Sequence, residues 1–224
     1  MYKKIYILPL FLLLLVSCKK ADTVSTTTST ASDTTNVAKS SDPLPSWNET
    51  PLKKEIIDYV TKVTKEGSPD FIPEQSRIAT FDNDGTLWAE KPYVQELFAF
   101  YQVKKMVEAN PELAKKQPFK AVVEKDKTFF EKGGDKALIE LVAATHTGMT
   151  EDEFETSVAD FYKSAKYPGK NVPVKQIRYQ PQLELLDYLR ANGFKTYIVT
   201  GGTIEVVRAI SQDFYGIPKD QVVG

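Results

Sequence analysis

Two short runs of strand-forming residues constrain the fold of this chain more than any other feature of its sequence. The first run, residues 77–81, contains β-branched and aromatic side chains and ends in the turn signal Asp82-Asn83-Asp84-Gly85. The second run, residues 194–200, is of the same kind and ends at Gly201-Gly202. Strands that each end in a polar, glycine-containing turn predict a doubly wound (Rossmann-like) parallel sheet of the α/β class, with ligands beyond the carboxyl ends of the strands.

The segment between the two runs is too long for a simple crossover. A strand–helix–strand unit takes roughly 30 residues, whereas Thr80 and Thr200 are 120 positions apart. Apolar and aromatic side chains recur at helical spacing in four stretches of this segment, and Thr150 with Glu153 forms a capping-box pattern at the start of the fourth. We therefore expect an inserted helical cap at residues 92–178, with most of its aromatic side chains buried.

The run Phe81-Asp82-Asn83-Asp84-Gly85-Thr86-Leu87 carries the most specific chemical signal. A calcium loop needs a longer series of oxygen ligands ending in Glu, and Thr86-Leu87-Trp88 breaks that series. The run resembles the first motif of the haloacid dehalogenase (HAD) superfamily, a hydrophobic strand followed by Asp-x-Asp-Gly-Thr. Residues 197–202 resemble its second motif. Residues 50–224 look most like the phosphoserine-phosphatase-like branch, whose helical cap is also inserted just after the first motif.

This resemblance implies hydrolysis of a small-molecule phosphate ester through an aspartyl-phosphate intermediate. Asp82 would be the nucleophile, and Asp84 would protonate the leaving oxygen and then activate water. Mg²⁺ would be held by the Asp82 carboxylate and the Asp84 backbone carbonyl. Turn amides near Asn83, the Thr200 hydroxyl and the Gly201 amide would bind the phosphate oxygens. Dehalogenase members expel a halide, which needs no proton, and lack the second Asp, so Asp84 favours phosphate esters.

Two further motifs of the family are not recognisable after the second strand. They are a Lys that steadies the phosphate charge and an acidic cluster that completes the metal site, both normally on later strands. Residues 201–224 supply one helix pattern and the entry to a third strand, and Lys219 and Asp220 fall in a predicted loop. We therefore expect a sheet that is truncated. The alternative function is a non-catalytic lipoprotein remnant, or a module that binds a ligand or partner.

The beginning of the chain predicts a targeting signal at residues 1–17. Two lysines precede an apolar run at residues 5–16, whose 12 positions suit a signal peptide and fall short of the roughly 20 that span a bilayer. Leu15-Val16-Ser17-Cys18 follows and resembles the lipobox of bacterial lipoproteins. The resemblance implies that Cys18, the sole cysteine, is acylated. The protein would then be anchored by lipid to a membrane of the bacterial cell envelope, periplasmic or outer-membrane facing.

A Ser/Thr-rich tether is expected at residues 18–46. Between Lys19 and Thr50, 14 of 32 residues are Ser or Thr, and such a stretch buries too little apolar surface to offset its ordering entropy. The α/β core would then comprise residues 47–91 and 179–224. Lys and Arg number 29 against 30 Asp and Glu, and this balance argues against a nucleic-acid partner held by bulk charge.

Five further residues carry weaker signals. Gln95 and Glu96 come just after the first motif, where caps of this family contact substrate, although neither has a specific signature. His146, the only histidine, lines a cap pocket in one interpretation and lies on the surface at a helix end in the favoured one. Trp88 and Tyr93 are expected to pack where the cap joins the core.

Overall fold

The computed structural model describes residues 42–224. The predicted signal peptide, Cys18 and most of the predicted tether lie outside the described residues. Within them, no helix is both long and apolar enough to cross a membrane.

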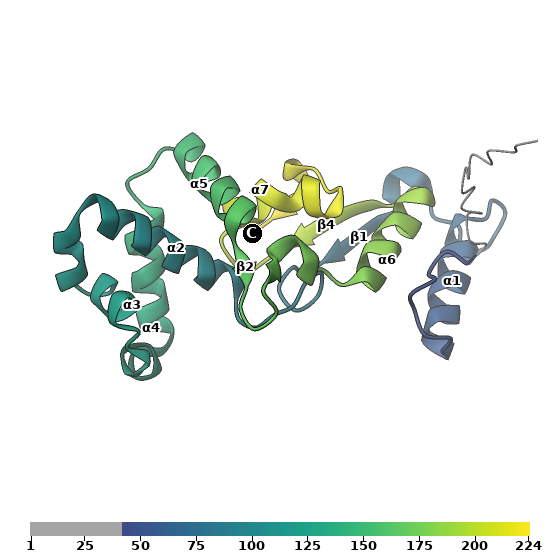
Figure 1. Cartoon of the computed structure of the whole chain (residues 1–224). Coiled ribbons are helices and arrows are strands. Elements are labelled where there is room, and N and C mark those ends of the chain that lie inside the picture. Colours follow the sequence, from purple (N-terminus) through teal and green to yellow (C-terminus); the bar gives the residue numbers. More distant parts are fainter. Residues whose placement is uncertain (1–41) are drawn as a thin grey trace, which may run out of the picture. The chain divides into compact units, whose positions relative to one another are not determined.

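The central sheet has three parallel strands in the order β1-β4-β5 (Figure 1). Its members are β1 (Ile78–Phe81), β4 (Lys195–Val199) and β5 (Val222–Val223). Phe81 pairs with Ile198, and Ile198 pairs with Val222, so the carboxyl ends of the strands meet at one edge of the sheet. The predicted α/β class with a parallel sheet is confirmed, and this edge brings together the turns that follow the first two strands.

Helices α6 (Gln180–Ala191) and α7 (Ile204–Tyr215) lie beside the strands (Figure 1), and α1 (Pro51–Thr64) precedes them in the chain. Thr50 and Pro51 set the start of α1, because the Thr50 side chain accepts a hydrogen bond from the Lys53 amide and Pro51 takes the first helical position. Val60 and Val63 of α1 pack against Leu189 and Phe194 and cover one part of the sheet. Short 3-10 helices lie at Glu74–Ser76, Pro111–Lys115, Val174–Ile177 and Lys219–Gln221.

The folded part begins earlier than the sequence predicts. Leu44, placed in the tether, is fully buried. Its amide donates to Asp42 Oδ1 at 3.0 Å, and Lys53 Nζ lies 2.6 Å from Asp42 Oδ2. Trp47 Nε1 donates to the carbonyl of Pro181 at 2.9 Å. Residues 42–47 thus contact the folded part, although composition alone assigns most of them to a tether.

The segment between β1 and β4 is largely helical. Its elements are α2 (Val94–Ala109), α3 (Phe119–Glu124), α4 (Lys127–His146), α5 (Glu151–Ser164), β2 (Lys166–Tyr167) and β3 (Val172–Pro173). The capping box of Thr150 and Glu153 opens α5 as predicted. The antiparallel hairpin of β2 and β3 was not predicted, because strands of two residues leave no periodic pattern. A kink at Gly134, where φ is 51°, divides α4.

One hydrophobic core joins the inserted helices to the sheet. Phe98 of α2, Phe161 of α5 and Phe214 of α7 belong to the same buried cluster as Trp88. The Trp88 ring lies 6.2 Å from the Phe214 ring, so its predicted position at the junction is confirmed. Tyr93 differs, since it is 41% exposed at the start of α2. The other aromatic side chains of the insertion are buried or half-buried.

Candidate active site

The loop after β1 is a tight turn in which several backbone amides donate hydrogen bonds to a single carbonyl. The amides of Thr86, Leu87 and Trp88 all donate to the Asn83 carbonyl, at 3.3, 2.9 and 3.4 Å. Gly85 has φ of +79°, a conformation that costs a residue with a side chain far more than glycine. The backbone conformation at position 85 therefore explains why glycine occupies this place in the Asp-x-Asp-Gly-Thr pattern. The turn leaves Asp82 exposed and Asp84 half-buried.

Both carboxylate oxygens of Asp84 accept hydrogen bonds from side chains. Trp88 Nε1 donates to Oδ1 at 2.7 Å, and Gln95 Nε2 donates to Oδ2 at 3.1 Å. The two donors come from different elements, the turn itself and the first turn of α2. Together they fix the plane of the Asp84 carboxylate.

Gln95 also connects the turns that follow the two strands. Its Oε1 accepts from the Thr203 amide at 2.6 Å. Because a backbone amide can only donate, this contact assigns oxygen to that end of the side chain and leaves Nε2 for Asp84. A Cβ added at Gly202 would lie 2.0 Å from Gln95 Nε2, so the approach of Gln95 requires glycine at position 202. The sequence singled out Gln95 only as a weak candidate for substrate contact and held no signal for this bridge.

The second strand ends at a buried threonine. Thr200 donates its amide to the Val223 carbonyl at 2.9 Å, and its Oγ1 accepts from the Gly202 amide at 3.1 Å. Accepting that bond leaves the hydroxyl proton free to be donated elsewhere. Gly201 is exposed, and nothing lies within 4 Å of a Cβ built there. The parallel pairing thus puts Thr200 and Gly201 at the same edge of the sheet as Asp82.

Asp82 and Asn83 interact within the turn. The Asn83 amide donates to Asp82 Oδ1 at 2.8 Å. The Asn83 side chain is fully buried, and neither of its polar atoms has a hydrogen-bond partner among the described residues. The phosphate-binding role expected for the amides near Asn83 stays a prediction, and in this conformation the Asn83 amide is engaged by its own neighbour.

Aromatic side chains line the buried side of Asp84. The Tyr162 ring of α5 lies 6.2 Å from Trp88 and 5.4 Å from Phe214. Burial, together with the nearby negative charge of Asp84, raises the pKa of the Tyr162 hydroxyl well above its usual value. Burial is also the main cause that raises the pKa of Tyr215. Local sequence patterns carry no signal for the place of these two tyrosines behind Asp84.

His146 ends α4 against aromatic rings rather than on an open surface. Its ring lies 5.3 Å from Phe98 and 5.1 Å from Phe154, and Nδ1 lies 2.8 Å from Thr145 Oγ1. Burial lowers its pKa. His146 lines a cavity that also contacts Gln95 and Thr203, so the expectation of a surface histidine is wrong. The apolar helix that carries it packs inward along α2.

Comparison with protein-family models matches residues 79–224 to the haloacid dehalogenase-like hydrolase family. The chain belongs to the HAD-like hydrolases. The matched region starts inside β1 and includes both motif turns. A search of curated proteins found no match. The superfamily inferred from the two motifs is thereby confirmed.

HAD enzymes generally use Mg²⁺, and the oxygens of the first turn suit that ion in part. Mg²⁺ takes one or two carboxylates, and it keeps several waters or binds substrate phosphate. The exposed Asp82 carboxylate and the Asp84 carbonyl are hard oxygen donors of this kind, and the Asp84 carboxylate is already occupied by Trp88 and Gln95. Residues 42–224 contain no group of three or more His, Cys, Asp or Glu arranged to hold a metal. The protein donors present therefore fit a magnesium ion that is mostly hydrated.

Proposed function

We propose that this HAD-like hydrolase is a Mg²⁺-dependent phosphomonoester hydrolase related to the phosphoserine-phosphatase-like branch. One observation carries the proposal: an exposed aspartate, Asp82, lies two residues from Asp84, whose carboxylate is held by Trp88 and Gln95. Family membership supports the hydrolase class. In this proposal residues 92–178 act as the cap over the reacting groups.

Asp82 is the nucleophile of the proposed reaction. Its Oδ1 accepts from the Asn83 amide, which leaves Oδ2 to attack phosphorus. The bond between Oδ2 and phosphorus forms as the bond to the leaving oxygen breaks, giving an aspartyl phosphate and an alcohol. Water then attacks the same phosphorus, and the Asp82 carboxylate leaves with its electron pair.

Asp84 moves the proton in both steps. It gives a proton to the leaving oxygen in the first step and takes one from the attacking water in the second. The hydrogen bonds from Trp88 and Gln95 hold its carboxylate plane, and half-burial against aromatic rings keeps water from surrounding it. Positioning of this kind contributes to catalysis because a proton is transferred only over hydrogen-bond distances.

Charge on the transferring phosphate would be neutralised by Mg²⁺ bound to the Asp82 carboxylate and the Asp84 carbonyl. Thr200 is proposed to donate its hydroxyl proton to a phosphate oxygen, and the open backbone at Gly201 admits the phosphate close to its amide. All of these groups belong to the two turns at one edge of the sheet.

Substitution of the nucleophile tests this function. Asp82→Asn should abolish Mg²⁺-dependent release of p-nitrophenol from p-nitrophenyl phosphate and leave the far-ultraviolet circular dichroism unchanged. Asp58→Asn, on the exposed face of α1, is the matched control and should keep wild-type turnover. Unchanged turnover in Asp82→Asn would contradict the assignment. No turnover by the wild-type chain would favour the alternative, a non-catalytic lipoprotein or a ligand- or partner-binding module.

We also propose that Cys18 anchors the protein to a bacterial envelope membrane. The support is the position of Cys18 after Leu15-Val16-Ser17 at the end of an apolar run. Metabolic labelling with an alkynyl fatty acid in a bacterial host should mark the wild-type chain and not Cys18→Ser. Equal labelling of both chains would exclude this anchor.

A further inference from the structure

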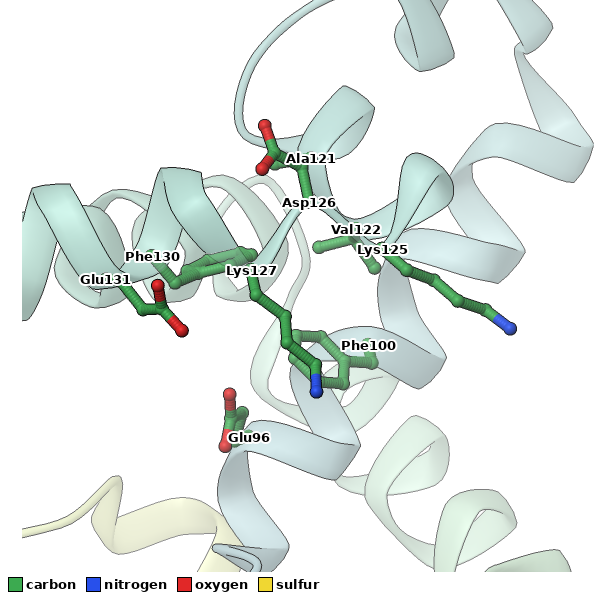
Figure 2. A pocket seen from close by; sticks show the side chains of 9 residues that line it. All are labelled: Glu96, Phe100, Ala121, Val122, Lys125, Asp126, Lys127, Phe130 and Glu131. Carbon is green, nitrogen blue, oxygen red and sulfur yellow. The ribbon is translucent and has the colours of Figure 1, made fainter.

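A cavity of about 640 Å³ lies among the inserted helices, between α2, α3 and the start of α4 (Figure 2). Its apolar lining comes from Phe100, Ala121, Val122 and Phe130. Figure 2 shows the charged ends of Glu96, Lys127 and Glu131 turned toward the same space, whereas Lys125 points away. We call this space the large cavity. Its volume is in the range of pockets that hold drug-sized ligands.

A second, small cavity of about 160 Å³ shares a lining residue with the large one and has others beside the candidate active site. Glu96 lines both cavities. The small cavity is also lined by Gln95 and Thr203, the two residues that are hydrogen-bonded to each other beside Asp84. A group joined to a phosphate near Asp84 would therefore lie next to the small cavity, whose lining shares Glu96 with the large one.

The lining of the small cavity favours an apolar occupant. Tyr93, Leu138 and Val142 line it and are 41%, 37% and 38% exposed. The free energy of the system falls when an apolar group covers exposed apolar side chains and removes them from water. No Lys or Arg lines this cavity within the described residues, so a carboxylate such as that of phosphoserine finds no cation here. The half-buried Glu96 is the only acid in the lining.

We propose that the two cavities bind the leaving group of the substrate, and that this group is a bulky, largely apolar alcohol or phenol. The inference rests on the proposed phosphomonoester hydrolysis and sets its substrate class. Shared residues carry it: Gln95, which donates a hydrogen bond to Asp84, lines the small cavity, and Glu96 lines both cavities. The serine of phosphoserine is polar and too small to reach the large cavity.

Turnover of matched esters tests the proposal in the full chain. We expect kcat/KM for 1-naphthyl phosphate to exceed that for phenyl phosphate, an aryl ester with a similar leaving group, by roughly tenfold. Val122→Asp, in the lining of the large cavity, should reduce kcat/KM about tenfold for 1-naphthyl phosphate and by a smaller factor for the smaller phenyl phosphate. Val123→Asp is the control, because Val123 neighbours it on α3, is 48% exposed and lines neither cavity.

A second pair of variants covers the case in which Val122→Asp does not fold. Leu138→Gln alters the small cavity at a position that is 37% exposed, and Ile139→Gln alters the next residue, 68% exposed and outside the lining. Leu138→Gln should lower kcat/KM for 1-naphthyl phosphate, and Ile139→Gln should leave it unchanged. Equal effects within both pairs, or a preference for phosphoserine, would overturn the proposal.

A binding measurement separates this proposal from the proposed reaction. Naphthyl fluorescence reports binding of 1-naphthyl phosphate to the Asp82→Asn chain, which should not turn it over. Binding that Leu138→Gln weakens and Ile139→Gln preserves would support the cavity even if no ester is hydrolysed. The proposal would be overturned if the chain bound no ester and instead formed a dimer that Leu138→Gln dissociates. The apolar lining around Leu138 would then be the contact surface for a second copy of the chain.

Discussion

Trp88 donates a hydrogen bond from Nε1 to Oδ1 of Asp84, four residues earlier in the same turn, at 2.7 Å. The indole is fully buried against Tyr162 and Phe214, so its direction is set by packing rather than by solvent. A buried donor of fixed direction holds a carboxylate better than a flexible surface side chain does, because little rotamer entropy is lost when the bond forms. Trp88 thus links the hydrophobic core to the orientation of Asp84.

Replacing this donor should weaken both the fold and the proposed reaction. Trp88→Phe keeps an aromatic ring but removes the N–H and part of the buried volume. The free energy of unfolding should fall by about 2–4 kcal/mol, since a hydrogen bond to a charged group and some packing are both lost. Urea denaturation measures this, and kcat for phenyl phosphate should fall at least tenfold. A variant with wild-type kcat would show that Asp84 needs no support from Trp88.

Gly202 should be indispensable to the bridge made by Gln95. A Cβ at position 202 would lie 2.0 Å from Gln95 Nε2, so Gly202→Ala must displace the amide from Asp84 and Thr203. We expect Gly202→Ala and Gln95→Ala to lower kcat by similar factors, roughly tenfold each, and the double variant to be no worse than either. A double-mutant cycle of kcat checks this, and additive losses would refute the bridge.

The adjacent glycine provides a control for stability. A Cβ at Gly201 meets no atom within 4 Å. Gly202→Ala should lower the free energy of unfolding by about 1–2 kcal/mol through the two lost hydrogen bonds, whereas Gly201→Ala should change it by less than about 0.5 kcal/mol.

Much of this arrangement followed from local signals in the sequence. The strands at residues 78–81 and 195–199, the turn after each and the start of α5 were predicted because each has a short-range pattern. Side chains that act across long distances in sequence had no such pattern. Gln95 reaches Thr203 over 108 positions, and Trp88 packs on Phe214, so only the folded chain shows that they converge on Asp84.

The wrong predictions for Leu44 and His146 also arose because the local sequence does not show the contacts that these residues make in the fold. Leu44 was assigned to the tether because its neighbours are polar, yet it is fully buried, and the adjacent Asp42 forms an ion pair with Lys53. His146 was expected at the surface because helix ends are commonly exposed. The rings of Phe98 and Phe154 cover it instead, a contact between three separate helices.

Stability should rise with pH across the range in which His146 titrates. Burial lowers its pKa in the folded protein below the usual value of about 6.5, so the unfolded chain binds more protons there. The contribution is fully present above about pH 6.5 and is lost as pH falls toward the folded-state pKa. His146 is the only histidine, so His146→Gln should flatten unfolding free energy between about pH 5.5 and 7. Equal slopes in both chains, measured by urea denaturation, would contradict this.

Asn83 should be less favourable to stability than an apolar residue in its place. Its side chain is fully buried, and Oδ1 and Nδ2 both lack a partner among the described residues. An unpaired buried amide costs about 1–3 kcal/mol, whereas an apolar side chain of similar size has no such cost. Asn83→Val should therefore raise the free energy of unfolding by about 1 kcal/mol, while Asn83→Asp, which buries a charge, should lower it by more than about 2 kcal/mol. Thermal and urea unfolding of the three chains measure both changes. If Asn83→Val is the less stable chain, the buried amide makes a stabilising contact that its surroundings do not reveal.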